Sequence, residues 1–226
     1  MLVGLTALPA SAGVGPDPTQ PCDPEFTGTS GDDVIFGSDW DDVICGRAGN
    51  DKLFGGDGED VLKGQDGNDQ LFGGDDSDSL VGGIGGDRLV AGFGVDLLNG
   101  GPGKDTADYS LTCGVIGSLN TGFIDNCADD DYVTFANGVS TVENLIGSPV
   151  FNDELEGDGQ ANEIRGNGGN DFISGRGGED RLFGEAGDDL IRGDGGDDFI
   201  NGGDQSTIGD VCSGGAGTNT IINCFP

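Results

Sequence analysis

The sequence predicts an all-β fold in which two parallel sheets stack into an elongated solenoid. Two observations predict it. The first is the abundance of glycine, at 48 of 226 residues, and the second is the recurrence of glycine, aspartate and one aliphatic residue on a nine-residue period. Helices tolerate glycine poorly and need apolar residues every three or four positions, so this period excludes a helix. The repeat must consist of turns and short strands.

The first array contains nine nonapeptides that follow one another without a gap from Gly28 to Asp108. The first position is glycine except at Ala91, and the fourth is glycine except at Trp40 and Asp76. An aliphatic residue or alanine fills the eighth position, and aspartate always fills the sixth. The sixth-position residues are Asp33, Asp42, Asp51, Asp60, Asp69, Asp78, Asp87, Asp96 and Asp105.

A second array begins at Gly147, with one longer unit near its start and another near its end. The residues that correspond to the sixth position are Asp153, Asn162, Asp171, Asp180, Asp189, Asp198, Asp210 and Asn219. Between the arrays the glycine rhythm is lost, and we interpret this part as irregular coils that continue the stack. We therefore expect one elongated domain with an N-terminal cap segment (13–27), a first array (28–108), intermediate coils (109–146), and a second array with a C-terminal cap (147–226).

The repeat also predicts which residues face the core. Six residues rich in glycine form a turn, and three residues around one aliphatic form a strand whose central side chain points inward. Such a strand needs a facing strand, so two nonapeptides form one coil of eighteen residues. Odd repeats then place Ile35, Leu53, Leu71 and Leu89 on one sheet, and even repeats place Ile44, Leu62, Leu80 and Leu98 on the other. Phe36, Phe54 and Phe72 are expected to stack on the outside of the first sheet.

The stacked aspartates predict a bound cation. Coils in a parallel stack lie about 4.7 to 4.9 Å apart, which brings each sixth-position carboxylate close to the next on the same side. Two carboxylates roughly 5 Å apart repel by about 3 kcal/mol at an effective dielectric near 20. Carboxylates and glycine carbonyls are hard oxygen ligands, and the chain has no histidine. Calcium is therefore the expected ion.

The overall charge restricts the partners. There are 42 acidic and 9 basic residues, which gives a formal net charge of -33. This charge repels nucleic acid and anionic membrane surfaces, so neither is expected as a partner. No stretch approaches the roughly 20 apolar residues that a transmembrane helix requires. An extracellular protein or polysaccharide is compatible with this charge as a partner.

The units resemble the calcium-binding nonapeptide GGxGxDxUx of repeats-in-toxin, or hemolysin-type, proteins, in which U is a large aliphatic residue. Residues 55–63 and 82–90 match this pattern in full. The resemblance implies a secreted bacterial protein with a right-handed two-sheet β-roll. It also implies that the turns bind several calcium ions through backbone carbonyls and the sixth-position aspartates named above, with Asn162 and Asn219 as weaker ligands.

The cysteines and the N-terminus favour an exported protein. Six cysteines without a CxxC pair favour disulfides in an oxidising compartment. Fifteen pairings are possible, and we expect the sequential one: Cys22–Cys45, Cys113–Cys127 and Cys212–Cys224. Residues 1–12 resemble the back half of a secretory signal peptide that ends in Ala10-Ser11-Ala12.

Three functional classes can be distinguished for such a repeat. A structural or adhesive calcium-binding module is favoured. A calcium-dependent polysaccharide lyase is the alternative, with Arg165, Arg176, Arg181 and Arg192 as its candidate basic residues. The absence of histidine excludes Ser-His and Cys-His nucleophiles, so we expect no enzyme. Ice binding needs a uniform array, whereas the fifth position varies and includes Val95 and Lys104. For the same reason substitution of Asp32, at this position, is expected to change only general electrostatics.

Overall fold

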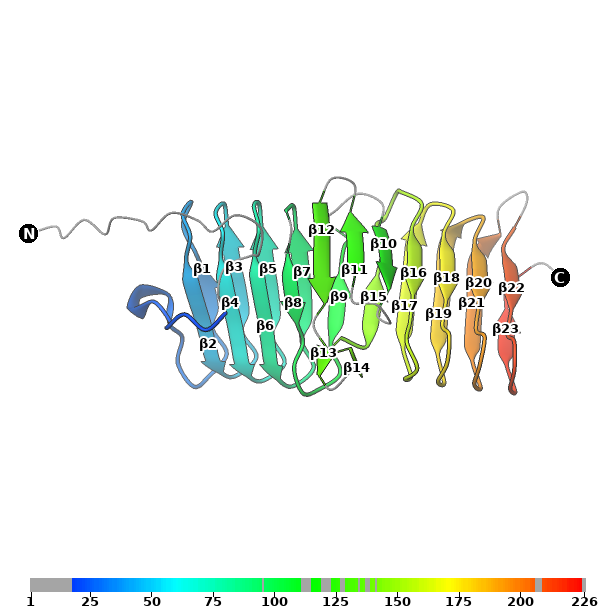
Figure 1. Cartoon of the computed structure of the whole chain (residues 1–226), viewed down its shortest axis with the longest axis horizontal. Helices are drawn as coiled ribbons and strands as arrows, with labels where there is room; N and C mark the ends of the chain where they lie inside the picture. The colour runs from blue at the N-terminus through cyan, green and yellow to red at the C-terminus, as the bar shows by residue number, and fades with distance from the viewer. Residues whose placement is uncertain are drawn as a thin grey trace, which may run out of the picture.

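The computed structural model describes residues 18–94, 96–110, 115–118, 123–126, 129–133, 135–136, 139–140, 142–205 and 209–224. Over these residues the chain is a long stack of short strands in two sheets, with the N-terminal part at one end and the C-terminal part at the other (Figure 1). The expected signal segment 1–12 and the expected Cys113–Cys127 bridge lie outside the described residues.

The first sheet contains the strands that close the odd repeats. In spatial order, its described strands are β1 (Val34–Phe36), β3 (Lys52–Gly56), β5 (Gln70–Gly74), β7 (Arg88–Gly92), β9 (Thr106–Asp108), β15 (Asn144–Ile146), β17 (Glu163–Gly168), β19 (Arg181–Gly187), β21 (Phe199–Gln205) and β23 (Thr220–Ile222).

The second sheet contains the strands that close the even repeats and a three-stranded insertion. Its described strands are, in spatial order, β2 (Val43–Ala48), β4 (Val61–Asp66), β6 (Ser79–Ile84), β8 (Leu97–Asn99), β12 (Asp129–Val133), β11 (Phe123–Asn126), β10 (Val115–Ser118), β16 (Glu154–Glu156), β18 (Phe172–Ser174), β20 (Leu190–Arg192) and β22 (Val211–Ser213). A separate hairpin joins β13 (Phe135–Ala136) to β14 (Val139–Ser140).

The strand register confirms the predicted all-β solenoid with two nonapeptides in each coil. Within each array, neighbouring strands pair in parallel with an offset of one coil; for example, Leu53 pairs with Leu71 and Leu62 with Leu80. The inward leucine and isoleucine side chains form one continuous core and are fully buried from Ile44 to Ile200. Because each strand contributes one such side chain, the core is narrow along its whole length.

The segment between the arrays differs from the expected irregular coils. In the first sheet β15 alone joins β9 to β17, in parallel. In the second sheet β10, β11 and β12 pair antiparallel, with β12 against β8 and β10 against β16 (Figure 1). An odd number of antiparallel strands lets both outer strands run parallel to their neighbours, so the sheet continues. Asn144 strengthens the junction in the first sheet, because its side chain bonds the Thr106 hydroxyl and the Glu163 amide.

Both ends of the solenoid are fastened as predicted. Cys22 is bonded to Cys45 in β2, and Cys212 in β22 is bonded to Cys224. The N-terminal cap includes a short 3-10 helix, η1 (Pro24–Phe26). Backbone amides on either side of this helix cover the free edge of β2: the N–H of Asp23 donates to the carbonyl of Val43, and the N–H of Gly28 donates to that of Cys45. Phe26 and Cys224 pack against the two ends of the core.

The predicted aromatic ladder is present on the outside of the first sheet. The rings of Phe36 and Phe54 stack with centroids 4.7 Å apart, and those of Phe54 and Phe72 stack at 4.6 Å. Their spacing matches the separation of neighbouring strands, so the ladder follows from the register. Among the described residues, no helix has the length and apolar character to cross a membrane.

Candidate metal centre

The glycine-rich turns form two rows at opposite edges of the stacked sheets. We call row 1 the turns that precede strands of the first sheet, and row 2 the turns that precede strands of the second sheet. In the first array row 1 carries Asp33, Asp51, Asp69, Asp87 and Asp105, and row 2 carries Asp42, Asp60, Asp78 and Asp96. In the second array row 1 carries Asn162, Asp180, Asp198 and Asn219, and row 2 carries Asp153, Asp171, Asp189 and Asp210.

Within each row the sixth-position side chains form a hydrogen-bonded ladder, here called the carboxylate ladder. The Oδ1 atom of one aspartate accepts the backbone N–H of the aspartate one coil earlier, as Asp69 does from Asp51 at 2.7 Å and Asp78 from Asp60 at 2.9 Å. In the second array Asp171 accepts from Asp153 at 2.9 Å. The nine-residue period predicts that these residues are neighbours, and the structure brings them together in rows.

The second oxygen of most ladder carboxylates has no hydrogen-bond partner. These Oδ2 atoms are fully buried, although burying a charged oxygen without a partner is costly. Among the described residues they belong to Asp51, Asp60, Asp69, Asp78, Asp87, Asp105, Asp171, Asp180, Asp189, Asp198 and Asp210. A repeated, buried and unpaired anionic oxygen is what a bound cation would satisfy.

The backbone supplies further oxygens beside these carboxylates. A methyl group added to Gly64 would overlap both the Oδ2 atom of Asp69 and the carbonyl oxygen of Gly82 in the next turn of the row. Gly55 stands in the same relation to Asp60 and Gly73. Glycine at the first position of these turns therefore leaves open the space that the two oxygens face, whereas the methyl group of Ala91 makes that turn the exception in the first array.

Burial raises the pKa of these carboxyls strongly. For Asp78, burial followed by repulsion from Asp96 raises the pKa to about 9. Burial is also the largest cause for Asp60, whose pKa rises to about 7, and for Asp69, whose pKa rises to about 6, while the amide that each accepts lowers it. Asp171 and Asp180 likewise rise to about 7. Without a counter-ion the solenoid therefore disfavours charged carboxylates at neutral pH.

Acidification should favour the folded chain when calcium is absent. The unfolded chain loses these protons near pH 3.9, whereas folded Asp60 and Asp78 keep theirs to about 7 and 9. The folded state thus holds more protons in between, so its stability is greatest below about pH 4 and falls as pH rises through 6 to 9. Circular dichroism of the dilute chain in chelator should show more β-structure at pH 4.5 than at pH 7.5. Equal spectra at the two pH values would contradict this expectation.

The donor set fits calcium. Each turn offers a carboxylate and nearby carbonyl oxygens, which are hard ligands in a glycine-rich loop. Among the described residues no three Cys, Asp or Glu side chains are close enough to hold a metal by themselves. Each site would therefore depend on carbonyl oxygens for much of its coordination, and this suits calcium better than zinc.

Two features of the rows were missed by sequence reasoning. Glu143, outside both arrays, continues the carboxylate ladder in row 1, because its Oε2 atom accepts the N–H of Asp105 at 2.6 Å. Only the strand register could have revealed it, since no glycine pattern surrounds it. The second feature is a ladder at the fifth position that runs the opposite way: the side chain of Asp32 accepts the N–H of Asn50, one coil later, at 2.8 Å. The expectation that Asp32 affects only general electrostatics is therefore wrong.

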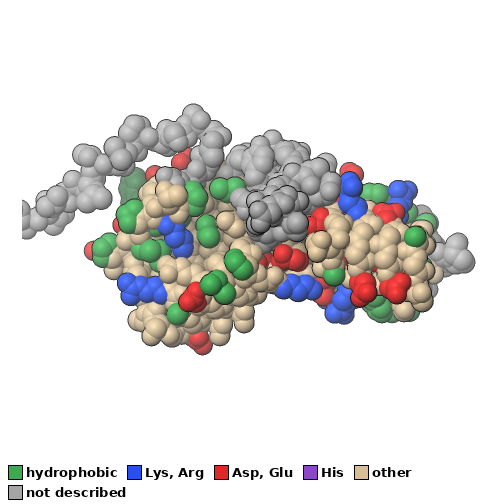
Figure 2. Space-filling model, turned by 60° about the horizontal axis from the view of Figure 1, so that its bottom comes forward, with side chains coloured by type: hydrophobic (Ala, Val, Ile, Leu, Met, Phe, Trp, Pro, Cys, Tyr) green, Lys and Arg blue, Asp and Glu red, His purple; other side chains and the backbone are tan. Residues whose placement is uncertain are grey.

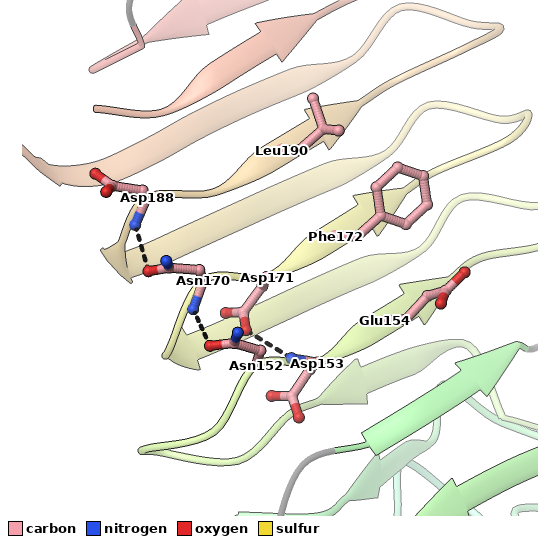
Figure 3. Close-up of a pocket in the computed structure, with 8 residues that line it drawn as sticks. All are labelled: Asn152, Asp153, Glu154, Asn170, Asp171, Phe172, Asp188 and Leu190. Carbon is pink, nitrogen blue, oxygen red and sulfur yellow. Dashed lines mark hydrogen bonds between the residues drawn. The ribbon is translucent and has the colours of Figure 1, made fainter. Parts of the chain in front are cut away.

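The fifth-position ladder also lines a shallow pocket in row 2 of the second array. Asn152 accepts the N–H of Asn170, and Asn170 accepts the N–H of Asp188, while Phe172 and Leu190 form the apolar side of the pocket (Figure 3). The polar groups drawn there are largely bonded to one another along the stack. The pocket is thus an outer surface of the ladder.

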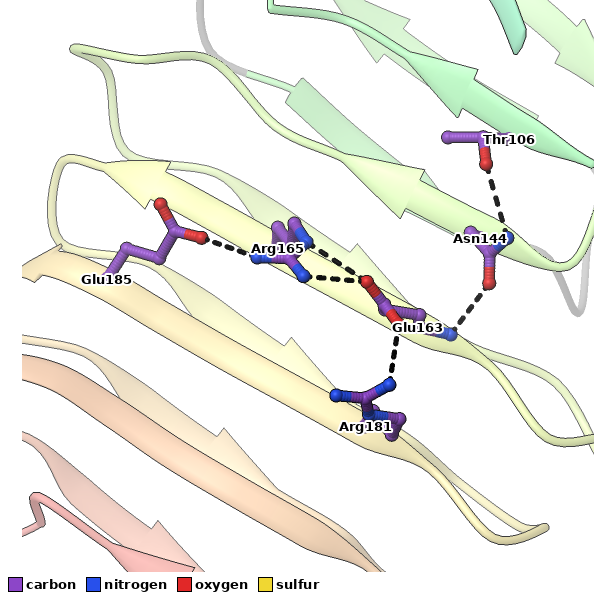
Figure 4. Close-up of polar contacts among 6 residues, drawn as sticks. All are labelled: Thr106, Asn144, Glu163, Arg165, Arg181 and Glu185. Atoms are coloured by element: carbon purple, nitrogen blue, oxygen red, sulfur yellow. Dashed lines mark hydrogen bonds and ion pairs between the residues drawn. The ribbon is translucent and has the colours of Figure 1, made fainter.

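The candidate basic residues of the lyase alternative lie in ion pairs and ring contacts, three of them on strands and Arg176 in a turn. Arg165 bonds Glu163 at 2.7 Å and Glu185 at 3.0 Å, and Arg181 pairs with the same Glu163 (Figure 4). The remaining two are similarly engaged: Arg176 pairs with Glu156, and Arg192 lies over the ring of Phe172.

The ladder carboxylates themselves lie inside the turns. The ladder aspartates from Asp42 to Asp105 are all less than 10% exposed. Other Asp and Glu side chains lie on the surface, as the face in Figure 2 shows. The ladder carboxylates are instead internal, where a small ion is suited to neutralise them.

A two-sheet parallel solenoid with a buried carboxylate in nearly every turn defines a cation-binding β-roll. The RTX calcium-binding nonapeptide repeat matches the chain at residues 26–53, 46–80, 54–89, 81–109, 151–182 and 174–207, which together cover more than half of it. The chain belongs to this family of RTX calcium-binding repeat proteins. A comparison with curated proteins gave no match.

Proposed function

We propose that this chain is a secreted protein that folds on binding several calcium ions between successive turns of each row, and that it acts as a structural or adhesive module. The observation that carries the proposal is the series of buried, unpaired Oδ2 atoms along the carboxylate ladder. No other group of the described turns neutralises these oxygens, and calcium is the ion that their ligand chemistry favours.

The arrangement of each carboxylate supports sharing of ions between turns. The Oδ1 atom of Asp69 contacts the preceding turn through the amide of Asp51, and its Oδ2 atom lies beside the carbonyl of Gly82 in the following turn. The Asp69 side chain therefore faces both the space toward the preceding turn and the space toward the following turn. A continuous series of ions along a row would neutralise the carboxylates in turn.

A secreted, non-catalytic role is supported by other features of the chain. Disulfides at both ends of the solenoid suit an oxidising compartment. The candidate arginines are engaged in ion pairs and ring contacts, so they do not favour the lyase alternative. A long, rigid and acidic rod is suited to presenting or spacing a binding surface outside the cell.

Calorimetric titration of the chelator-treated chain tests the calcium part of this proposal. We expect several calcium ions to bind per chain, and magnesium to bind much more weakly, because it requires regular octahedral geometry and dehydrates reluctantly. The control is Asp57→Asn, which removes an exposed acid from the same turn as Asp60. It should leave the number of bound ions unchanged. Equal binding of magnesium and calcium would contradict a calcium-specific site.

A further inference from the structure

The turns that begin a row are built differently from the turns that follow them. Each array has a first turn in row 1 and a first turn in row 2, which gives four row-starting turns. Their second positions hold Thr29, Ser38, Ser148 and Asp158, none of which has a positive φ. In the following turns the second residue always lies in the left-handed region. These residues are Arg47, Gly56, Gln65, Gly74, Gly83, Gly92, Gly101, Asn167, Arg176, Glu185, Asp194, Gly203 and Gly215.

The φ angle of the second residue decides whether the second oxygen of the ladder carboxylate has a hydrogen-bond donor. In the first turn of row 1, Oδ2 of Asp33 accepts the N–H of Thr29 at 2.6 Å and its hydroxyl at 2.9 Å. In the first turn of row 2, Oδ2 of Asp42 accepts the N–H and hydroxyl of Ser38 at 2.7 and 2.8 Å.

The second array repeats this arrangement in both rows. Oδ2 of Asp153 accepts the N–H of Ser148 at 2.8 Å, and Oδ1 of Asn162 accepts that of Asp158 at 2.9 Å. The device thus reappears after the insertion, where each row starts again. Asn162 shows in addition that a neutral amide is tolerated at a row start.

Two donors on one carboxylate oxygen oppose a cation at the same place. The hydrogens of an amide and a hydroxyl carry positive partial charge, and they occupy the directions in which that oxygen would bind a metal ion. In the following turns the left-handed second residue leaves Oδ2 without a donor, as at Asp51 and Asp60. The sixth-position residue therefore has two different roles, which depend on the conformation of the second residue of its turn.

We propose that the ladder side chain of a row-starting turn binds no calcium. In each row, the first ladder carboxylate that binds an ion is then the one in the second turn. This inference rests on the proposed function, because it concerns which turns hold the ions. The row-starting turns close through their own hydrogen bonds, so they need no ion to hold their shape. In the first array they also lie next to the Cys22–Cys45 bridge, where the first coil is fastened.

The test compares two aspartates of row 1 in the full chain, with bound calcium counted by equilibrium dialysis. Asp33→Asn should keep the wild-type number of ions, since an amide can accept the same two hydrogen bonds. Asp51→Asn should lower the number, since its Oδ2 has no other partner. A gain-of-binding variant gives an independent readout: Thr29→Gly produces the full consensus unit GGSGDDVIF and should add one ion. Thr29→Ser, which keeps the hydroxyl, is its control and should add none.

The possible results separate this inference from the proposed function. If Asp33→Asn loses as many ions as Asp51→Asn, or if Thr29→Gly adds none, row-starting turns already bind calcium and the inference is overturned alone. If the wild-type chain binds no calcium, the proposed function and the inference are overturned together.

Discussion

In chelator at neutral pH, we expect the chain to lack regular β-structure and to gain it cooperatively as calcium is added. Each pair of neighbouring carboxylates about 5 Å apart contributes roughly 3 kcal/mol of repulsion at an effective dielectric near 20. Burial has already raised the pKa of Asp78 to about 9, so ionised aspartates are poorly tolerated in the ion-free solenoid. The core is one side chain wide in each sheet and offers little to offset these costs.

Far-ultraviolet circular dichroism during a calcium titration measures this transition. A coil spectrum in chelator should change to a β spectrum, and chelator should reverse the change. Magnesium at the same concentration is the matched control and should produce little β-structure. A chain that is already fully β-structured in chelator at pH 7.5 would contradict the expectation, since the ladder would then be stable without ions.

The repeat made most of the fold predictable. A nine-residue period with one inward aliphatic allows only one register, because a shift by a single residue would turn Leu71 outward and Gln70 inward. The sheet assignment and the aromatic ladder at Phe54 follow from this register, and the structure confirms them. The two terminal disulfides, expected from sequential pairing, are confirmed as well.

The insertion could not be predicted from the sequence in the same way. Between the arrays the period is absent, so nothing fixed the pairing partner or direction of β10, β11 and β12. Antiparallel pairing there depends on which strands meet in space, and their sequences carry no such signal. The role of Glu143 was hidden for the same reason, since it reaches row 1 only because β15 stacks directly on β9.

The candidate site was predictable by residue type and spacing, but not by atom. The sixth-position period placed Asp69 next to Asp51 and Asp87, as the structure confirms. It could not show that one oxygen is bonded to an amide while the other is unpaired, because this depends on the φ angle of the second residue of the turn. Gln65 adopts a left-handed conformation there although glycine is usual, so the residue type alone does not reveal it.

The effect of removing a ladder carboxylate should depend on its place in the row. Asp69 lies in the interior, with Oδ1 toward Asp51 and Oδ2 beside Gly82, whereas Asp33 begins row 1. Asp69→Ala should remove ligands from the spaces on both sides and interrupt the row. We expect it to lower the number of bound ions and to raise the calcium midpoint of folding by about tenfold or more, since a hydrogen bond to a charged group is worth about 1.5 to 3 kcal/mol. Asp33→Ala should shift the midpoint less, because only its own turn depends on it.

Calorimetric titration and circular dichroism of matched variants would test this dependence. Asp57→Ala is the control, because Asp57 is an exposed acid of an interior turn; Asp32 is unsuitable, since it accepts the amide of Asn50. Asp69→Asn separates the two oxygens of the carboxylate: it can keep the bond to the Asp51 amide but loses the anionic Oδ2, so its midpoint should fall between those of wild type and Asp69→Ala. Equal losses at Asp69 and Asp33, or a control as damaging as either, would mean that calcium is not shared between successive turns of a row.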